Sequence, residues 1–425
     1  MSRLDELIAE LCPNGVPYKP LGEIGYFYGG LSGKSKDDFT NGNAKFITYM
    51  NVYSNLAIDT EIIDMVKIGK NERQNTVEYG DILFTGSSET PDECGISSVL
   101  TKETNEKLYL NSFCFGFRLI DKDLLLPDFS KYLFRSEKIR KQIKRTASGV
   151  TRFNVSKKKM EQVVIPIPPL PVQQEIVRIL DTFTELTAEL TAELTARKKQ
   201  YEYYRDLLLA FDNDDAEIER RMSRLDELIA ELCPNGVEQI ALGDIIFETK
   251  ERNKECIYDQ VRSVTNTGIL VPTSEYFDKQ ITSEDTSNYK VVRKGMFVYN
   301  PSRINIGSIA WSKENEPVIV SPMYIVFDIK REKVCQEYLM YYLRSDIGMH
   351  KINSKVEPGA RFRLPIESLS KITIPLPPLP VQQEIVRILD KFTELTAELT
   401  AELTARQKQY EYYRDKLLTF KEVTA

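Results

Sequence analysis

Two blocks of this sequence occur twice, and this duplication constrains the fold more than any other feature. The first sixteen residues return unchanged at Met222–Val237, and the 43 residues Pro166–Leu208 return at Pro375–Leu417 with four differences. The stretches between the blocks, Pro17–Ile165 and Glu238–Ile374, are largely unlike each other. A solenoid would vary evenly from repeat to repeat. Near-identical frames around divergent inserts therefore indicate two modules that perform one task on different targets.

The second repeated block has the pattern of a long helix. Pro168–Pro171 contains three prolines and forms an extended lead-in, since proline is excluded from a helix interior. Gln173–Ala210 then has no proline or glycine, and its apolar residues recur every three or four positions. Such a helix spans roughly 55 Å at a rise of about 1.5 Å per residue. With its twin at Gln382–Phe420 we expect an antiparallel two-helix coil. From periodicity alone, any amphipathic helix pair in a bundle is the alternative.

Each long-helix block carries a repeated tetrapeptide. Its three copies are Glu185–Ala188, Glu189–Ala192 and Glu193–Ala196, with three more at Glu394–Ala405. Small threonine and alanine side chains flank each leucine, so a partner helix can approach closely.

The inserts mix β-like runs with a basic helical end. Strands are expected at Asp81–Phe84, Phe113–Leu119, Gly295–Tyr299 and Tyr324–Phe327, and helices at Phe129–Lys144 and Gln336–Met349. The acidic segment Asp212–Arg221 is typical of an exposed linker. The predicted fold class is α+β, with two α/β domains separated by two long antiparallel coiled-coil helices in a pseudo-twofold internal repeat. The predicted boundaries are 1–165 for the first domain, 166–221 for the central helix and linker, 222–374 for the second domain and 375–425 for the C-terminal helix.

Composition excludes several classes of protein. The single histidine, His350, argues against histidine metal sites and Ser-His-Asp catalysis. The six cysteines lack any CxxC pair, which is typical of reduced cytoplasmic thiols. The charged, amphipathic N-terminus does not resemble a signal peptide, and no apolar run reaches the roughly 18 residues of a membrane span. We therefore expect a cytoplasmic protein without a metal.

Three short motifs have a structural alternative that fits better. Tyr28–Ser35 resembles a phosphate-binding P-loop but begins with tyrosine where glycine is required. A polar loop that contacts DNA phosphate through Lys34 and Ser35 is the preferred interpretation. Tyr299–Ser302 lacks the second proline and the aromatic of the amino-methyltransferase motif, so we expect a turn after a strand. The prolines of Pro166–Pro171 suit an SH3 ligand, but their place before a helix in both copies favours a structural elbow.

Charge distribution is more informative than net charge, which is −6 from 57 basic and 63 acidic residues. Asp128–Met160 contains eleven basic residues opposed only by Asp128 and Glu137. Such a patch is the footprint of phosphate contact, and its alternative is a solvated helix face. The basic residues are Lys131, Arg135, Lys138, Arg140, Lys141, Lys144, Arg145, Arg152, Lys157, Lys158 and Lys159.

One arginine recurs at the repeat offset. Arg152–Phe153 and Arg361–Phe362 lie 209 residues apart, which is the offset of the long-helix block. Each pair follows a glycine-containing turn, at Ser148–Gly149 or Pro358–Gly359. Arginine is the commonest direct reader of guanine. A phosphate clamp and a surface ion pair are the alternatives.

The chain resembles a known family, the specificity subunits of type I restriction–modification systems (HsdS). The resemblance rests on PIPPLPVQQEIVRIL and PLPPLPVQQEIVRIL at the start of the long helices, on the TAEL-type tetrapeptides, and on the segments Tyr79–Leu100 and Lys294–Ala310. It covers the whole chain. One departure is the unchanged return of the first sixteen residues at Met222, as though two half-subunits were fused.

The resemblance implies that each variable region is a target-recognition domain for one half of a bipartite DNA sequence. It implies that the paired helices set the spacer and dock two methyltransferase subunits. Restriction subunits would join to give an ATP-dependent translocating nuclease. S-adenosylmethionine, ATP and Mg would be bound by these partners, and this chain would bind no cofactor and contribute no catalytic residue. A coiled-coil scaffold without DNA specificity and a self-contained enzyme are the alternatives, but neither explains two near-identical frames around different inserts.

The family supplies no transferable residue code for base contacts, so the candidate DNA-binding residues rest on charge and turn position. They are Lys34, Ser35, Ser87, Ser88, Lys141, Lys144, Arg145, Ser148, Arg152, Asn300, Ser302, Arg303, Arg361 and Arg363. No catalytic or metal-binding residue is predicted.

Overall fold

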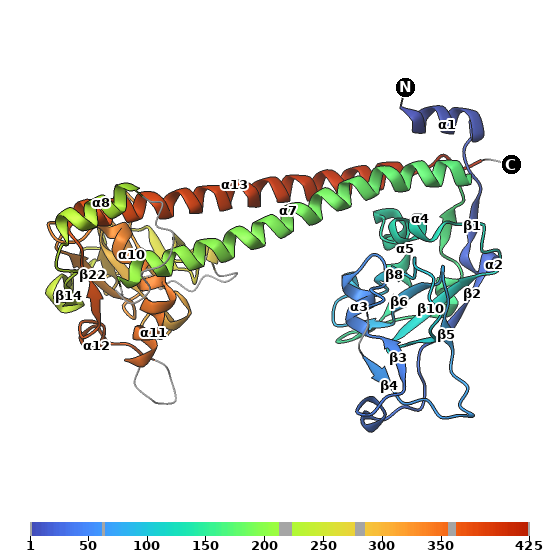
Figure 1. The fold of residues 1–425 in the computed structure, drawn as a ribbon, viewed down its shortest axis with the longest axis horizontal. Helices are drawn as coiled ribbons and strands as arrows, with labels where there is room; N and C mark the ends of the chain where they lie inside the picture. The colour runs from blue at the N-terminus through green and yellow to red at the C-terminus, as the bar shows by residue number, and fades with distance from the viewer. Residues whose placement is uncertain (1, 62–63, 212–222, 277–284, 356–362, 424–425) are drawn as a thin grey trace. The chain divides into compact units, whose positions relative to one another are not determined.

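The computed structural model describes residues 2–61, 64–211, 223–276, 285–355 and 363–423, which form two compact units (Figure 1). Unit 1 consists of Met1–Thr191 and Ala401–Ala425, and unit 2 of Ala192–Thr400. Each unit therefore holds one variable region and a part of both long helices. The predicted α+β class with a two-domain repeat and two long helices is confirmed. The predicted domain boundaries stay predictions.

Unit 1 is built on a four-stranded antiparallel sheet in the order β2-β10-β6-β8. A second four-stranded sheet has the order β4-β3-β9-β5, and smaller sheets have the orders β11-β12-β7 and β1-β13. Its strands are β1 Tyr18–Pro20, β2 Gly25–Gly29, β3 Ala44–Ile47, β4 Met65–Val66, β5 Thr76–Val77, β6 Ile82–Thr85, β7 Ser87–Ser88, β8 Ser97–Val99, β9 Leu108–Leu110, β10 Cys114–Leu119, β11 Ala147–Ser148, β12 Phe153–Val155 and β13 Val164–Pro166. Its helices are α1 Arg3–Leu11, α2 Leu21–Ile24, α3 Tyr49–Ser54, α4 Pro127–Leu133, α5 Glu137–Thr146 and α6 Lys157–Met160, with short 3-10 turns η1 Lys36–Phe39 and η2 Pro91–Glu93.

The main sheet of unit 1 is buried on both faces. Along β6, Ile82 and Phe84 join the core formed with α4, α5 and the start of the first long helix, whereas Leu83 joins a second core with α3 and β9. Successive side chains of a strand point to opposite faces, so an almost continuous apolar run marks a strand covered on both sides. The strands expected at Asp81–Phe84 and Phe113–Leu119 are confirmed as β6 and β10.

Unit 2 repeats this plan with a main sheet in the order β15-β22-β19-β20, a second sheet β17-β16-β21-β18 and the pair β14-β23. Its strands are β14 Gln239–Ala241, β15 Ile246–Glu248, β16 Val261–Val264, β17 Leu270–Pro272, β18 Lys290–Val292, β19 Phe297–Tyr299, β20 Ile309–Trp311, β21 Val318–Val320, β22 Ile325–Ile329 and β23 Thr373–Pro375. Its helices are α8 Ser223–Leu232, α9 Thr273–Tyr276, α10 Gln336–Arg344, α11 Asp346–Ser354 and α12 Ile366–Leu369, with η3 Leu242–Asp244 and η4 Ile304–Ile306.

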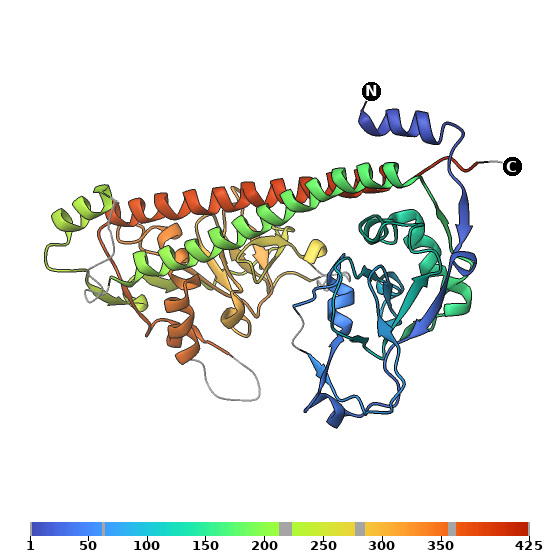
Figure 2. The same ribbon diagram turned by 45° about the vertical axis from the view of Figure 1, so that its right-hand side comes forward.

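The long helices are α7 Leu170–Ala210, with 41 residues, and α13 Leu379–Leu417, with 39 residues. Each begins three residues before its predicted start, so Pro171 lies in the first turn, where a missing N–H leaves no hydrogen bond unmade. Within each unit the start of one long helix packs on the end of the other, and Figure 2 shows them side by side. The rings of Phe183 and Tyr413 stack in unit 1 at 5.4 Å, and those of Tyr204 and Phe392 in unit 2 at 5.5 Å. The predicted antiparallel pairing is confirmed.

Two helices predicted as continuous are each interrupted by a serine. The segment expected at Phe129–Lys144 consists of α4 and α5, and the one at Gln336–Met349 consists of α10 and α11. The Ser136 hydroxyl donates to the carbonyl of Leu133 at 2.7 Å, and the Ser345 hydroxyl donates to that of Tyr342 at 2.7 Å. Each serine has extended backbone at the N-cap of the next helix. The prediction of continuous helices was therefore wrong.

Both ends of the chain belong to unit 1 (Figure 1). The N–H of Val16 donates to the carbonyl of Lys421 at 2.8 Å, and the N–H of Val423 donates back to Val16 at 3.1 Å. The Tyr18 hydroxyl donates to the carbonyl of Phe420 at 2.9 Å. The C-terminal segment thus pairs with the segment that leads into the first variable region.

Candidate nucleic-acid interface

A short hairpin in unit 1 brings four of the predicted residues together. Strands β11 and β12 are joined by the loop 149–152, and β12 pairs in turn with β7, so Ser148, Arg152, Ser87 and Ser88 lie in one small sheet or its loop. Gly149 has φ +154, and a Cβ there would meet the carbonyl of Arg152, so the turn requires glycine. The neighbouring Val150 is 92 % exposed. The hairpin tip is therefore presented to solvent.

Arg152 has a fixed orientation at this tip. Its Nε and Nη2 donate to the hydroxyl of Ser87 at 3.3 and 3.0 Å, and its guanidinium lies over the ring of Phe113 at 5.4 Å. Phe113 itself is 55 % exposed. A guanidinium already held by a hydroxyl and an aromatic ring loses little rotamer freedom when it binds a base edge or a phosphate. Ser87 is buried, so its role is to position Arg152.

Ser88 is also a structural residue. Its hydroxyl donates to Glu93 at 3.0 Å, and the hydroxyl of Tyr53 donates to the other oxygen of the same carboxylate at 2.8 Å. These hydrogen bonds hold the pKa of Glu93 below its ordinary value, with the bond from Tyr53 the largest cause. The segment between β7 and β8 is thereby fixed next to the hairpin.

The basic stretch predicted at Asp128–Met160 is not one surface. Arg140 is buried and donates to the carbonyls of Asp92, Cys94 and Gly95, and Arg135 donates to Ser97 at 2.6 Å and to carbonyls at the end of α3. Burial lowers the pKa of both arginines to about 10. These two side chains hold loops in place from inside, so the interpretation of the whole stretch as a phosphate footprint was wrong.

The predicted lysines of α5 form ion pairs. Lys141 pairs with Glu137 one turn earlier at 2.6 Å, and Lys144 pairs with Asp92 at 2.5 Å. Arg145 is exposed at the end of the helix, next to β11. Exposed pairs contribute little to stability and exchange readily for other partners, so Lys141 and Lys144 stay candidates for phosphate contact.

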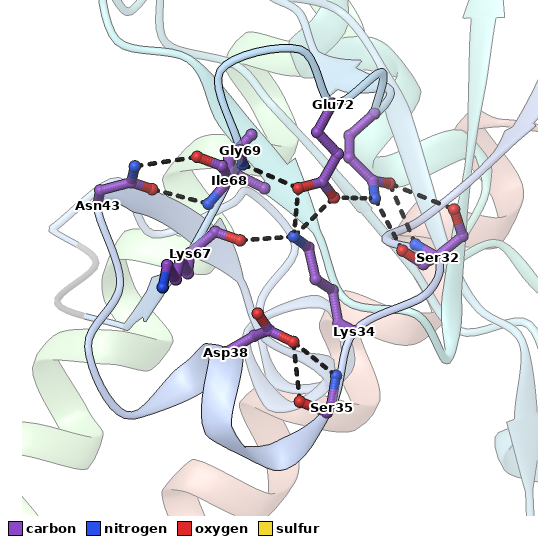
Figure 3. Close-up of polar contacts among 10 residues, drawn as sticks. Ser32, Lys34, Ser35, Asp38, Asn43, Lys67, Ile68, Gly69 and Glu72 are labelled. Atoms are coloured by element: carbon purple, nitrogen blue, oxygen red, sulfur yellow. Dashed lines mark hydrogen bonds and ion pairs between the residues drawn. The ribbon is translucent and has the colours of Figure 1, made fainter.

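Lys34 and Ser35 belong to an internal network (Figure 3). The ammonium of Lys34 lies 2.6 Å from Glu72, donates to the carbonyl of Lys67 at 2.5 Å, and has a side chain only 7 % exposed. The Ser35 backbone N–H and hydroxyl both donate to Asp38, at 2.8 and 2.9 Å, at the start of η1. The geometry does not support phosphate contact by either residue, because their polar groups are already used within the loop.

The predicted residues of unit 2 lie near the end of β19, at the place that corresponds to the Arg152 hairpin of unit 1. Asn300 follows β19, and its side-chain carbonyl accepts from the N–H of Ser302 at 3.0 Å, which forms the turn expected at Tyr299–Ser302. Leu364 donates to the carbonyl of Pro301 at 2.9 Å and so brings its neighbour Arg363 alongside.

Ser302, Arg303 and Arg363 are all exposed. Arg361 and the turn Pro358–Gly359 lie outside the described residues.

The two places have the same backbone pattern. In unit 1, Val155 donates to the carbonyl of Gly86 at 2.9 Å. Leu364, the donor to Pro301 in unit 2, lies 209 residues after Val155. The residue after each acceptor is a serine, Ser87 or Ser302. One frame thus presents a different set of side chains in each unit.

Phe113 is a candidate interface residue that the sequence did not reveal. We expected a strand from Phe113, but β10 begins at Cys114 and leaves the ring in the preceding loop. An aromatic at a strand boundary carries no sequence signal for whether it faces the core or solvent.

Among the described residues, no helix combines the length and apolar character that crossing a membrane requires. The same residues contain no group of three or more His, Cys, Asp or Glu side chains placed to hold a metal ion.

Comparisons with known proteins agree on one family. The model of the Type I restriction modification DNA specificity domain matches residues 13–197 and 234–406. The chain is 34 % identical over 284 residues to the type I restriction enzyme EcoR124I/EcoR124II specificity subunit of Escherichia coli, an alignment that covers 63 % of this chain and 65 % of that protein. It therefore matches just under two thirds of that relative's length.

Solved structures show the same fold at low sequence identity. The crystal structure of a type I restriction-modification S subunit from M. genitalium aligns with a TM-score of 0.50 and 15 % identity, over 95 % of this chain and 96 % of that one. A chain from a structure of complex assembly and conformational transition in the type I R-M system aligns with a TM-score of 0.57 and 16 % identity, over 96 % and 98 %.

Proposed function

The chain belongs to the family of type I restriction–modification specificity subunits, and from this we propose that it is the DNA-recognition subunit of such a complex, in which each variable region reads one half of a bipartite target. The observation that carries the proposal is the shared frame of the two interfaces. The bonds from Val155 to Gly86 and from Leu364 to Pro301 place equivalent loops in both units. The side chains on those loops differ, as two different half-sites require.

The division of labour at each interface follows from the chemistry of the groups. The guanidinium of Arg152 is held by Ser87 and Phe113, and its paired N–H donors suit a bidentate contact to guanine O6 and N7. Arg303 and Arg363 are exposed cations at the equivalent place in unit 2, although neither is the repeat equivalent of Arg152. Lys141, Lys144 and Arg145 suit phosphate oxygens, which fix register but carry no sequence information.

The long helices have two proposed roles. As antiparallel partners they set the spacer between the half-sites, and their near-identical surfaces dock two methyltransferase subunits. Under this proposal the partners bind S-adenosylmethionine, ATP and Mg, restriction subunits complete the nuclease, and this chain is not itself an enzyme. We propose a cytoplasmic location, which suits the six free thiols.

Mapping of methylated adenines tests the proposal. The full chain is expressed with its modification subunit in a host without other methylation, and long-read sequencing identifies the modified motif. We expect two defined half-sites with a fixed gap. Arg152→Ala should relax or abolish one half and leave the other intact, whereas Arg145→Ala should leave the motif unchanged. Methylation without a bipartite motif would exclude the recognition role and favour a scaffold.

A further inference from the structure

A second exposed basic surface lies in unit 1, outside the interface described above. It is formed by the loop 67–75, which joins β4 to β5 and has the sequence KIGKNERQN. Lys67, Lys70 and Arg73 are all exposed, and Lys36 is exposed on the adjoining loop. Within three residues of these four cations in sequence, the exposed carboxylates are Asp37 and Asp64, so the exposed cations outnumber them.

The only acid of this loop is turned inward (Figure 3). The carboxylate of Glu72 accepts from the Gly69 N–H at 2.9 Å, from Lys34 at 2.6 Å and from Gln74 at 2.6 Å. These three donors, with Gly69 the largest cause, lower the pKa of Glu72 to about 2. Glu72 therefore stays ionised at neutral pH and is neutralised by Lys34 within the loop. The exposed cations therefore still outnumber the exposed carboxylates beside them in the sequence.

The loop is also fixed to its neighbours. Asn43 and Ile68 exchange two hydrogen bonds at 2.8 and 3.0 Å, and Gln74 and Ser32 exchange two at 2.8 and 3.1 Å. The N–H of Glu72 donates to the carbonyl of Gly69 at 3.1 Å, which closes a turn with Lys70 at its corner. Because the backbone is already ordered, binding through these side chains loses less entropy than binding through a free loop.

We infer that the loop 67–75 is a second phosphate-contact surface of unit 1, through which Lys67, Lys70 and Arg73 hold double-stranded DNA without reading its sequence. This inference rests on the proposed function and extends it to residues far in sequence from the Arg152 hairpin. It also gives Lys34 a positioning role, since Lys34 neutralises the acid and supports the loop from inside.

Salt-dependent DNA binding tests the inference. The full chain, in complex with its modification subunit, is titrated with its target duplex and with an unrelated duplex, in wild-type form and with Lys70→Ala and Arg73→Ala combined. Each phosphate contact contributes about 0.9 to the slope of log affinity against log salt. We expect the slope to fall by about 2 and the affinity near 0.15 M salt to fall roughly tenfold for both duplexes. The methylated motif should stay the same.

A matched variant separates contact from net charge. Lys102→Ala combined with Lys107→Ala removes the same charge from exposed positions of another loop of unit 1 and should leave the slope close to wild type. Equal slopes for the two double variants, with wild type still selective for its target, would overturn the inference alone. A wild-type complex without sequence preference would instead overturn the proposed function.

Lysine acetylation footprinting gives an answer that does not depend on any variant folding. Bound target duplex should protect Lys67 and Lys70 and leave Lys102 and Lys107 reactive. Unchanged reactivity of Lys67 and Lys70 would contradict the inference. So would loss of modification-subunit assembly in the Lys70 and Arg73 variant, because the loop would then be a protein-docking surface.

Discussion

At the scale of single residues, Gln173 and its repeat equivalent Gln382 show how the repeated frame is held. The side-chain carbonyl of Gln173 accepts from the N–H of Leu126 at 2.9 Å, and its amide donates to the carbonyls of Leu124 and Pro168 at 3.1 and 2.8 Å. Gln382 makes the same three bonds at 3.0, 2.8 and 2.8 Å in unit 2. Both side chains are fully buried. Each glutamine ties the start of a long helix to the loop before α4 or α10.

Replacement of either glutamine by methionine should destabilise its unit. Gln173→Met removes the hydrogen-bond partner of one part-buried N–H, one part-buried carbonyl and one buried carbonyl, and the expected loss is about 3 kcal/mol in the free energy of unfolding. Gln382→Met should give a similar loss, whereas Gln407→Met at an exposed position of α13 should change it by less than about 0.5 kcal/mol. Urea unfolding followed by circular dichroism measures all three. A Gln173→Met variant as stable as Gln407→Met would contradict this role.

The lowered pKa values of two carboxyl groups lead to a prediction of how the stability changes with pH. Arg178 donates two hydrogen bonds to Glu175, and Arg387 donates two to Glu384, so the pKa of each carboxyl lies below its ordinary value of 4.5. A lowered pKa contributes stability above pH 4.5 that is lost as the pH falls through the folded-state pKa. Glu175→Gln with Glu384→Gln should therefore be less stable than wild type at pH 7, by a difference that shrinks below about pH 4. Thermal unfolding across this range checks it, with Glu185→Gln as an exposed control; a difference independent of pH would contradict it.

The sequence shows where charged residues are concentrated, but it does not show in which direction each side chain points. Arg152 follows a glycine turn at a repeated position and is exposed, as that pattern indicates. Arg135 and Arg140 lie in the same basic stretch, yet they point inward because carbonyls of distant loops accept their donors. Lys34 looked like a phosphate ligand because its partner Glu72 lies 38 residues away. Long-range partners of this kind leave no local pattern.

At the scale of elements, periodicity predicted the long helices well and the short helices poorly. The run without proline or glycine fixes α7 to within three residues at its start. The breaks at Ser136 and Ser345 were missed because serine is tolerated within helices, and only its hydrogen bond to the preceding turn shows that it ends one. Strands such as β6 were predictable because a run that is buried on both faces is apolar almost throughout.

The tetrapeptides of α7 and α13 give a prediction about target spacing. Removing Glu185–Ala188 together with its counterpart in α13 shortens each helix by about 6 Å. One base pair spans about 3.4 Å, so the gap between the methylated half-sites should shrink by one or two base pairs. Methylation sequencing of the paired deletion measures the gap. Deletion from α7 alone is the control and should disturb the pairing of the helices; an unchanged gap in the paired deletion would exclude the ruler.

At the scale of the whole molecule, the duplication predicted more than composition did. A net charge of −6 gives no sign of a nucleic-acid partner. The repeat offset, by contrast, relates Val155 and Leu364, whose N–H groups make equivalent backbone hydrogen bonds at the two candidate interfaces. What the duplication could not predict is the structure of the inserts, since Phe113 and the loop 67–75 lie outside the repeated blocks.

The order of synthesis differs from the order of assembly. Leu418 is buried in the core of unit 1, and the ring of Tyr410 lies 6.4 Å from that of Tyr132. These residues leave the ribosome more than 200 positions after Thr191, which at about 5–20 residues per second is a delay of roughly 10–40 s. During that time the apolar face of α7 in unit 1 has no α13 to cover it. The first domain to be translated is therefore the last to be finished, and any ribosome that stops early releases an exposed hydrophobic helix.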